Sequence, residues 1–161
     1  MPATTAGDWI THLQLQKHIE GGWYSEIYRS EEKIENENRS LCTHIYFLLQ
    51  ENDFSALHCI QSDELWHFYH GDNLIVYELE RDGLLTQHKL GTDITNGFLP
   101  FCMIKKGSWF GARVSEGGSF SLVGCTVSPG FDFKDLVLAN AGELSLQYPS
   151  HKKLIASLCR H

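Results

Sequence analysis

The chain has 161 residues, of which 42% are hydrophobic and 20% charged, and its formal net charge is −7 with His neutral. This length and balance are typical of one globular domain with a single core. Lys and Arg are scattered along the chain, whereas nucleic-acid binding needs a concentrated basic face. Nucleic acid is therefore not an expected partner.

The sequence also bears on membranes and on the cellular compartment. No stretch approaches the ~20 apolar residues of a membrane-spanning helix, and residues 1–8 lack the basic and apolar regions of a secretory signal. The five cysteines are widely spaced without a Cys-x-x-Cys pair, which favours buried thiols over disulfides or a zinc site. We expect a cytoplasmic protein with no membrane partner.

The first expected element is a short helix over residues 8–17. Asp8 is its candidate N-cap, and Gly21 and Gly22 follow as a stop. The apolar residues near helical spacing are Trp9, Ile10, Leu13 and Leu15.

From Trp23 onward, polar and apolar residues alternate with a period of two, which indicates half-buried strands. Polar turns separate the runs, and the charged, Asn-rich residues 31–39 indicate an exposed loop. Short strands at regular spacing predict an all-β sandwich or barrel rather than a βαβ fold. The predicted strands cover residues 23–30, 41–50, 56–60, 64–70, 73–80, 84–90, 100–105, 109–114 and 119–127.

The last third of the chain changes character. Residues 134–138 form a short apolar run of helical type. Residues 150–159 predict a helix that Ser150 caps and that packs over one end of the barrel. We find neither an internal repeat nor a linker, so residues 1–161 are interpreted as a single domain.

The most informative motif begins at His58. Residues 58–71 resemble the first signature of a cupin, in which two His, a Glu and a Gly follow at set spacing. His58, Glu64 and Gly71 match this spacing, while Ile60 stands where the second His is expected. The motif thus keeps part of a polar cluster and loses a metal ligand.

The second cupin signature, Pro-x-Gly-x-x-His, is also altered. Residues 105–110 keep only Gly107, and Phe110 takes the position of the His ligand. A catalytic divalent site normally needs three protein ligands, and His58 and Glu64 supply two. His70 is expected on the same strand face as Glu64, but roughly 20 Å away along an extended strand. We therefore expect neither a resident metal nor another cofactor.

Three blocks, residues 20–30, 62–72 and 122–133, carry a closer resemblance. Together they resemble the cupin branch long catalogued as a domain of unknown function, whose members are similar to cupins of the dTDP-sugar 3,5-epimerase type. The resemblance implies a cupin jelly roll, a double-stranded β-helix barrel. It also implies a homodimer and a small-molecule pocket in the barrel mouth.

The resemblance also implies a chemistry for His58, which stands where epimerase-type cupins carry their catalytic base. A His of near-neutral pKa can remove a proton α to a carbonyl if a carboxylate orients it, and either Glu64 or Glu26 could do so. Candidates for the partner acid are Tyr24, Tyr28, Tyr46 and Tyr69. The chain offers few cations for a nucleotide diphosphate, which disfavours a dTDP-sugar. Alternatively, His58 and Glu64 form a purely structural hydrogen-bonded pair.

The expected pocket walls come from two groups of residues. Tyr24, Glu26, Tyr28 and Arg29 share one strand, which suits either a ligand or a dimer interface. Aromatic residues of other strands supply further walls or simply fill the core: Trp66, Phe68 and Phe110.

The leading functional hypothesis is a cupin that binds a small organic, sugar-like molecule and acts as a metal-independent isomerase or epimerase, with His58 as base. One alternative is a non-catalytic small-molecule-binding protein. The other is a metallo-cupin with a reduced ligand set.

Overall fold

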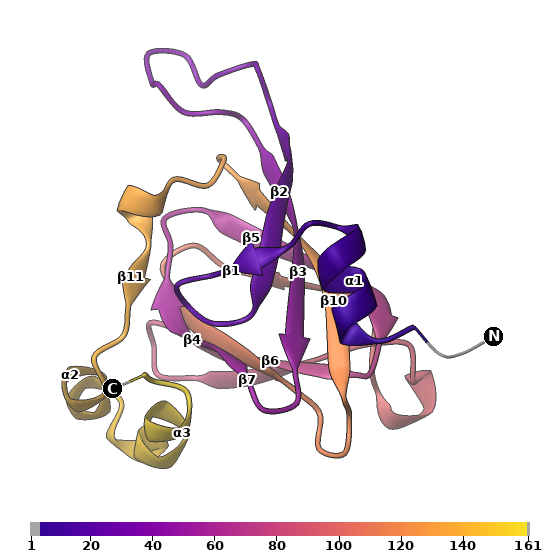
Figure 1. Ribbon diagram of the computed structural model, residues 1–161. Coiled ribbons are helices and arrows are strands. Elements are labelled where there is room, and N and C mark those ends of the chain that lie inside the picture. Colours follow the sequence, from indigo (N-terminus) through magenta and orange to yellow (C-terminus); the bar gives the residue numbers. More distant parts are fainter. Residues whose placement is uncertain (1–3, 161) are drawn as a thin grey trace.

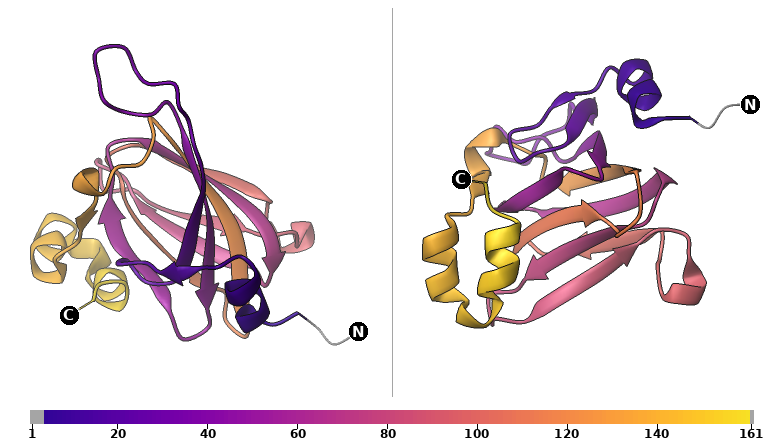
Figure 2. Two further views of the ribbon diagram at one scale, coloured as in Figure 1. Left: turned by 45° about the horizontal axis from the view of Figure 1, so that its top comes forward. Right: turned by 60° about the horizontal axis from the view of Figure 1, so that its bottom comes forward.

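The computed structural model describes residues 4–160, which form two antiparallel sheets packed face to face (Figures 1 and 2). The six-stranded sheet has the order β1-β2-β3-β10-β5-β8, and the five-stranded sheet has the order β11-β4-β9-β6-β7. The strands are β1 (Gln16–Lys17), β2 (Trp23–Arg29), β3 (Thr43–Gln50), β4 (Phe54–Cys59), β5 (Asp63–Gly71), β6 (Leu74–Leu79), β7 (Leu85–Leu90), β8 (Phe101–Ile104), β9 (Trp109–Val114), β10 (Phe120–Ser128) and β11 (Val137–Leu138). This arrangement is a jelly-roll barrel, and the predicted all-β class is confirmed.

Each strand expected from the alternating pattern is present, with ends within two residues of the prediction. Two short strands were not expected. β1 falls inside the predicted N-terminal helix, and β11 falls in the run predicted to be helical. β11 pairs with β4 through Val137–Cys59 and Leu138–His58. A strand of two residues is too short to show an alternating pattern. It is recognised only by its pairing with a neighbouring strand.

The N-terminal helix α1 spans Ala6–His12, which is earlier and shorter than predicted. Thr5, rather than Asp8, is the N-cap. Asp8 occupies the third helical position and accepts a hydrogen bond from the Thr5 backbone N–H at 2.8 Å, which completes a capping box. Beyond the helix, Gln14 adopts a φ of 53° and turns the chain toward β1.

The C-terminal segment forms two short helices beside one end of the barrel, α2 (Ala141–Gln147) and α3 (Lys152–Ser157) (Figure 2). The Leu57 N–H donates to the Leu158 carbonyl at 2.7 Å, which fixes this segment to β4. The expected helix over 150–159 is present only in part, because residues 149–151 form a 3₁₀ turn and Ser150 is not the cap. Within residues 4–160, no helix is long and apolar enough to cross a membrane.

Two β-bulges change which side chains face the interior. In β2, Glu26 pairs with Ile45 but Tyr28 pairs with His44, so the extra residue turns Tyr28 to the outer face. A bulge in β5 likewise turns His70 outward, where its ring lies 5.3 Å from that of Trp9. The expectation that His70 shares a face with Glu64 is therefore wrong.

The main core fills the space between the sheets around Trp66, which is fully buried. The Trp66 ring packs edge-on against Phe47 and Phe110, with centroids 5.9 and 6.4 Å away. Its indole N–H has no hydrogen-bond partner among the described residues. The contribution of Trp66 to stability is therefore packing alone.

We predict that Trp66→Ala lowers the free energy of unfolding by about 3–5 kcal/mol because it leaves a large cavity. Trp66→Phe should cost only about 1–2 kcal/mol, since no hydrogen bond is lost with the indole N–H. Urea unfolding of both variants measures the difference. Equal losses would contradict the account of an unpartnered indole.

Candidate functional site

A cavity of about 310 Å³ opens at the barrel mouth, on the inner side of the six-stranded sheet. Its walls come from β1, β2, β3, β4, β5 and β10, from the turn before β2 and from the loop after β10. The lining residues are Gln16, His18, Glu20, Tyr24, Ser25, Glu26, Thr43, Ile45, His58, Glu64, Cys125, Val127, Phe131 and Phe133. Segments far apart in the chain thus converge on one small space.

Glu20 and His58 are in contact at the buried side of this cavity. The His58 Nδ1–H donates to the Ala56 carbonyl at 2.7 Å, and His58 Nε2 lies 3.1 Å from Glu20 Oε2. The other Glu20 oxygen accepts a hydrogen bond from Ser55 Oγ at 3.1 Å. On the other side, His18 Nδ1 accepts from the Glu20 backbone N–H at 3.2 Å. Every polar atom of the pair therefore has a defined neighbour.

This geometry requires a proton between Glu20 and His58. With its proton on Nδ1, a neutral His58 presents the lone pair of Nε2 to a carboxyl oxygen. Burial lowers the pKa of His58 to about 4, and burial raises the pKa of Glu20, with His18 opposing that rise. Both shifts favour the un-ionised pair, in which Glu20 carries the proton and donates it to His58 Nε2.

Glu64 is the second buried carboxyl of the cavity. Burial, helped by the nearby Glu20, raises the pKa of Glu64 to about 8, while a hydrogen bond with the Cys125 thiol opposes the rise. Glu64 is therefore mostly un-ionised at pH 7. Burial also lowers the pKa of His18. The interior of the cavity is consequently close to electrically neutral despite its acids and imidazoles.

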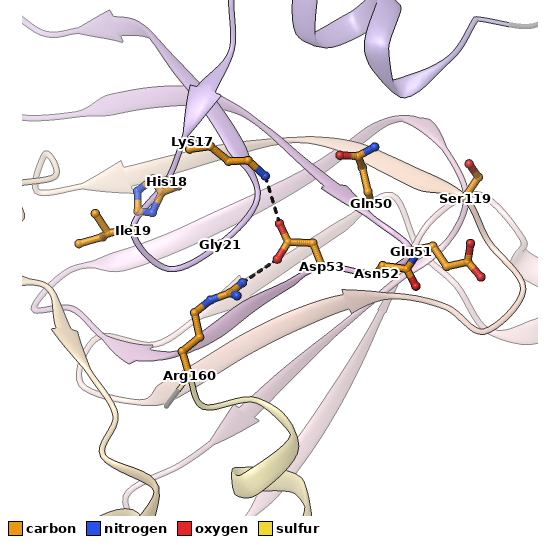
Figure 3. A pocket seen from close by; sticks show the side chains of 10 residues that line it. All are labelled: Lys17, His18, Ile19, Gly21, Gln50, Glu51, Asn52, Asp53, Ser119 and Arg160. Atoms are coloured by element: carbon orange, nitrogen blue, oxygen red, sulfur yellow. Dashed lines mark hydrogen bonds and ion pairs between the residues drawn. The ribbon is translucent and has the colours of Figure 1, made fainter.

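A brace outside the cavity fixes the turn next to Glu20, and Figure 3 shows its Arg160–Asp53 pair beside Gly21. Arg160 Nη2 donates to Asp53 Oδ1 at 2.6 Å and to the Phe54 carbonyl at 2.7 Å, and Arg160 Nε donates to the Glu20 carbonyl at 3.4 Å. Asp53 also accepts from the Gly22 N–H at 2.9 Å. Gly21 has a φ of 108°, and a Cβ there would collide with Arg160 and the Phe54 carbonyl. Only glycine fits this turn.

Four of the residues predicted for the site line the cavity: His58, Glu64, Tyr24 and Glu26. The orienting carboxylate is none of those predicted, because Glu20 is the group in contact with His58. Glu26 instead pairs with Arg29 at 2.6 Å.

The other predicted wall residues lie elsewhere. The bulge in β2 exposes Tyr28 on the outer face. Arg29 lies at the rim and donates to the Phe131 carbonyl at 3.0 Å without lining the cavity. Trp66 and Phe110 are buried in the core, with Phe68 packed against it. Phe110 nevertheless supports the site, because its ring centroid lies 4.1 Å from that of His58.

Sequence reasoning missed His18, Glu20, Phe131 and Phe133 as site residues. Glu20 had one visible signal, the Gly21-Gly22 pair that follows it, which indicates a backbone under special constraint. Phe131 and Phe133 lie on the loop that follows β10. Nothing in the local sequence indicates that this loop bends over the barrel mouth.

The residues at this site do not fit the metal of metallo-cupins. Ile60 and Phe110 occupy two ligand positions and belong to the buried core. Across residues 4–160, no group of three or more His, Cys, Asp or Glu side chains is arranged to hold a metal ion. We therefore derive no chemical step through a metal.

The two-sheet barrel with a polar cavity in its mouth is the architecture of a cupin. The chain belongs to the cupin superfamily, because the family model described as "Cupin superfamily (DUF985)" matches residues 7–139. No curated protein matches the chain.

The chain is also similar to solved structures. A protein from Shewanella oneidensis is 40% identical, with a TM-score of 0.93 and coverage of 98% of this chain and 99% of that one. A hypothetical protein from Leishmania major is 34% identical, with a TM-score of 0.93 and coverage of 98% and 100%. A cupin 2 domain-containing protein from Halorhodospira halophila shares only 12% identity, with a TM-score of 0.60 and coverage of 91% and 88%, and shows the fold alone.

The raised pKa of Glu64 predicts a pH dependence of stability. The folded state binds more protons than the unfolded state between the ordinary pKa of 4.5 and about 8, so the free energy of unfolding falls as pH rises through this window. Because one pKa unit corresponds to about 1.4 kcal/mol, the loss should amount to a few kcal/mol. Glu64→Gln stays neutral and should flatten the slope between pH 5 and 8.

Urea unfolding at pH 5, 6, 7 and 8 measures this effect, with Glu116→Gln on an exposed turn as the matched control. His58 acts in the opposite direction, because its lowered pKa of about 4 removes stability as pH falls below 6.5. The difference between wild type and Glu64→Gln isolates the Glu64 contribution. If the free energy of unfolding of Glu64→Gln falls with pH as steeply as that of wild type, Glu64 does not have a raised pKa.

Proposed function

We propose that the cavity binds a small organic molecule and that the protein is a metal-independent isomerase or epimerase that uses the Glu20–His58 pair as its base. The observation that carries this proposal is the 3.1 Å contact between a carboxyl oxygen and an imidazole nitrogen in a buried, ligand-sized cavity. When the pair takes up a further proton, Glu20 keeps one proton and His58 becomes cationic, so the charge lies on the imidazole.

The two residues of the pair have different roles in this proposal. Both ring nitrogens of His58 are engaged, Nδ1 by the Ala56 carbonyl and Nε2 by Glu20. The imidazole therefore acts through Glu20, whose carboxyl is the member of the pair available to a ligand. This differs from the expectation that His58 itself removes the proton, and the cause is the hydrogen bond to Ala56.

The resemblance to dTDP-sugar 3,5-epimerase-type cupins supports proton abstraction next to a carbonyl, but it does not extend to the nucleotide. Neither Lys nor Arg is among the lining residues, and a diphosphate requires such contacts. A non-catalytic binding protein with the same cavity is the outcome to be distinguished by experiment.

We predict that Glu20→Gln abolishes proton transfer and leaves the fold intact, because its amide can still donate to His58 Nε2 and accept from Ser55. The loss should be about 10²–10⁴-fold. The measurement is exchange of α-protons of small carbonyl compounds with deuterium oxide, followed by ¹H NMR, with exposed Glu51→Gln as control. Undiminished exchange in Glu20→Gln would rule out the pair as base. Binding without exchange in wild type would indicate a binding protein.

We also propose that the outer face of the six-stranded sheet pairs with a second copy of the chain. This face has an apolar groove whose lining contains no Asp, Glu, Lys or Arg, so two copies meet without like-charge repulsion. Large side chains around it are exposed, including Ile27, Tyr69 and, on the edge strand β8, Phe101 and Met103. Such an apolar, aromatic surface is typical of homodimer interfaces.

If this face is the dimer interface, Ile27→Asp should shift the protein to monomer, because it buries an unpaired charge in a symmetric contact. Ile27 is 47% exposed in the single chain, so the substitution should leave the fold unchanged. Leu146→Asp on α2, at a site 81% exposed, is the control. Light scattering after gel filtration gives the mass; a monomeric wild type, or an Ile27→Asp dimer of unchanged stability, would contradict the proposal.

A further inference from the structure

The cations near the cavity mouth are already engaged. Arg29 pairs with Glu26 at 2.6 Å and donates to the Phe131 carbonyl. Arg39 pairs with Asp135 at 2.6 Å and donates to the Gly130 carbonyl at 2.9 Å. An anionic ligand would therefore be buried in the cavity without a counter-charge, which is strongly unfavourable. The cavity therefore disfavours ligands that carry a phosphate or a carboxylate.

The two buried acids differ in the availability of their protons. The proton of Glu20 is directed at His58 Nε2, 3.1 Å away. Glu64 lines the cavity from β5, on the sheet opposite the β4 strand of His58, and interacts with the Cys125 thiol, a weak donor that occupies an acceptor site of the carboxyl. The Glu64 O–H is thus the donor left for a ligand. A carboxylic acid kept neutral by burial can donate a hydrogen bond to a carbonyl oxygen on which charge develops.

The size and walls of the cavity further restrict the ligand. A volume of about 310 Å³ is at the lower end of the roughly 300–1,000 Å³ of ligand pockets, so a nucleotide would not be enclosed. Tyr24, Phe131 and Phe133 provide flat apolar surfaces, and the Phe131 and Phe133 rings are edge-to-face with centroids 4.9 Å apart. Ser25 and Thr43 add hydroxyl groups. Flat apolar walls with scattered hydroxyls suit a compact, hydroxyl-bearing molecule.

We propose that the ligand is an uncharged hydroxy-carbonyl compound of monosaccharide size or smaller, and that Glu64 donates a hydrogen bond, and then its proton, to the carbonyl oxygen. The inference rests on the proposed function and names its substrate class and its acid. The site then holds a base, Glu20 backed by His58, and an acid, Glu64, around one ligand.

The proposed step is an enolisation. The C–H bond next to the carbonyl breaks. Glu20 passes its own proton to His58 Nε2 and takes the carbon-bound proton, so His58 becomes cationic while Glu64 becomes a carboxylate. The C–H electron pair forms the carbon–carbon double bond of the enol, and the carbonyl π electrons move to the oxygen, which takes the proton of Glu64. Return of a proton to carbon and of the hydroxyl proton to Glu64 gives an isomer or epimer. Neither an oxidant nor a co-reactant is required.

An organic cation is the competing ligand class, because acids and aromatic rings also suit a cation. The two classes differ in their pH dependence. An uncharged carbonyl needs the Glu64 proton, so its affinity should fall as pH rises from 7 to 9. A permanent cation needs ionised Glu64, so its affinity should rise over the same range.

The experiment uses the full-length protein and isothermal titration calorimetry at pH 7, 8 and 9. The probes are dihydroxyacetone and D-fructose as uncharged hydroxy-carbonyl compounds, choline as a permanent cation and D-gluconate as an anion. We expect an uncharged probe to bind at least tenfold more tightly than choline and gluconate at pH 7. Its affinity should weaken several-fold by pH 9 in wild type and stay constant in Glu64→Gln, whose amide remains a donor.

Tighter binding of choline or gluconate would overturn the ligand class, as would no binding of either uncharged probe. An identical pH response in wild type and Glu64→Gln would overturn the role of Glu64. These outcomes are separable from a failure of the proposed function, which depends on deuterium exchange and on Glu20→Gln. If an uncharged probe binds but its α-protons do not exchange with deuterium, the ligand class is supported and the proposed proton transfer is refuted.

Discussion

The site depends on one constraint, a single proton shared between a carboxyl and an imidazole that are both buried. Glu20 and His58 meet at 3.1 Å, and an ionised Glu20 without this partner would be costly so far from water. The pair avoids the cost of burying a charge because the two groups together carry no net charge. The hydrogen bond from His58 to the Ala56 carbonyl sets the tautomer, and so decides which residue of the pair faces the ligand.

The rest of the barrel maintains this neutrality. Phe110 packs against the His58 ring, and Trp66 packs behind it, so water is kept from one side of the pair. Two positions that would carry metal ligands in other cupins are filled by apolar side chains, Ile60 and Phe110. The same two substitutions therefore remove metal ligands and add apolar side chains to the core beneath the cavity.

The fold was largely predictable from sequence, whereas the site was predictable only in part. Alternation of polarity is a local signal, and it placed the long strands correctly. His58 and Glu64 were found because their spacing belongs to a motif. Bulges are not visible in such a pattern, so the outward turn of Tyr28 was missed. Glu20 was missed because its contact with His58 arises from the fold and leaves no periodic trace.

The brace between Arg160 and the Glu20 turn has a consequence for how the molecule assembles. It joins positions 140 residues apart, so the entropy of closing a very long loop must be met before it forms. Contacts of such long range tend to form late in folding. A chain whose sheets are already paired would therefore have a barrel without an ordered site. The turn that carries Glu20 would stay unbraced until the C-terminal segment docks, so ordering of the site should lag behind formation of the barrel.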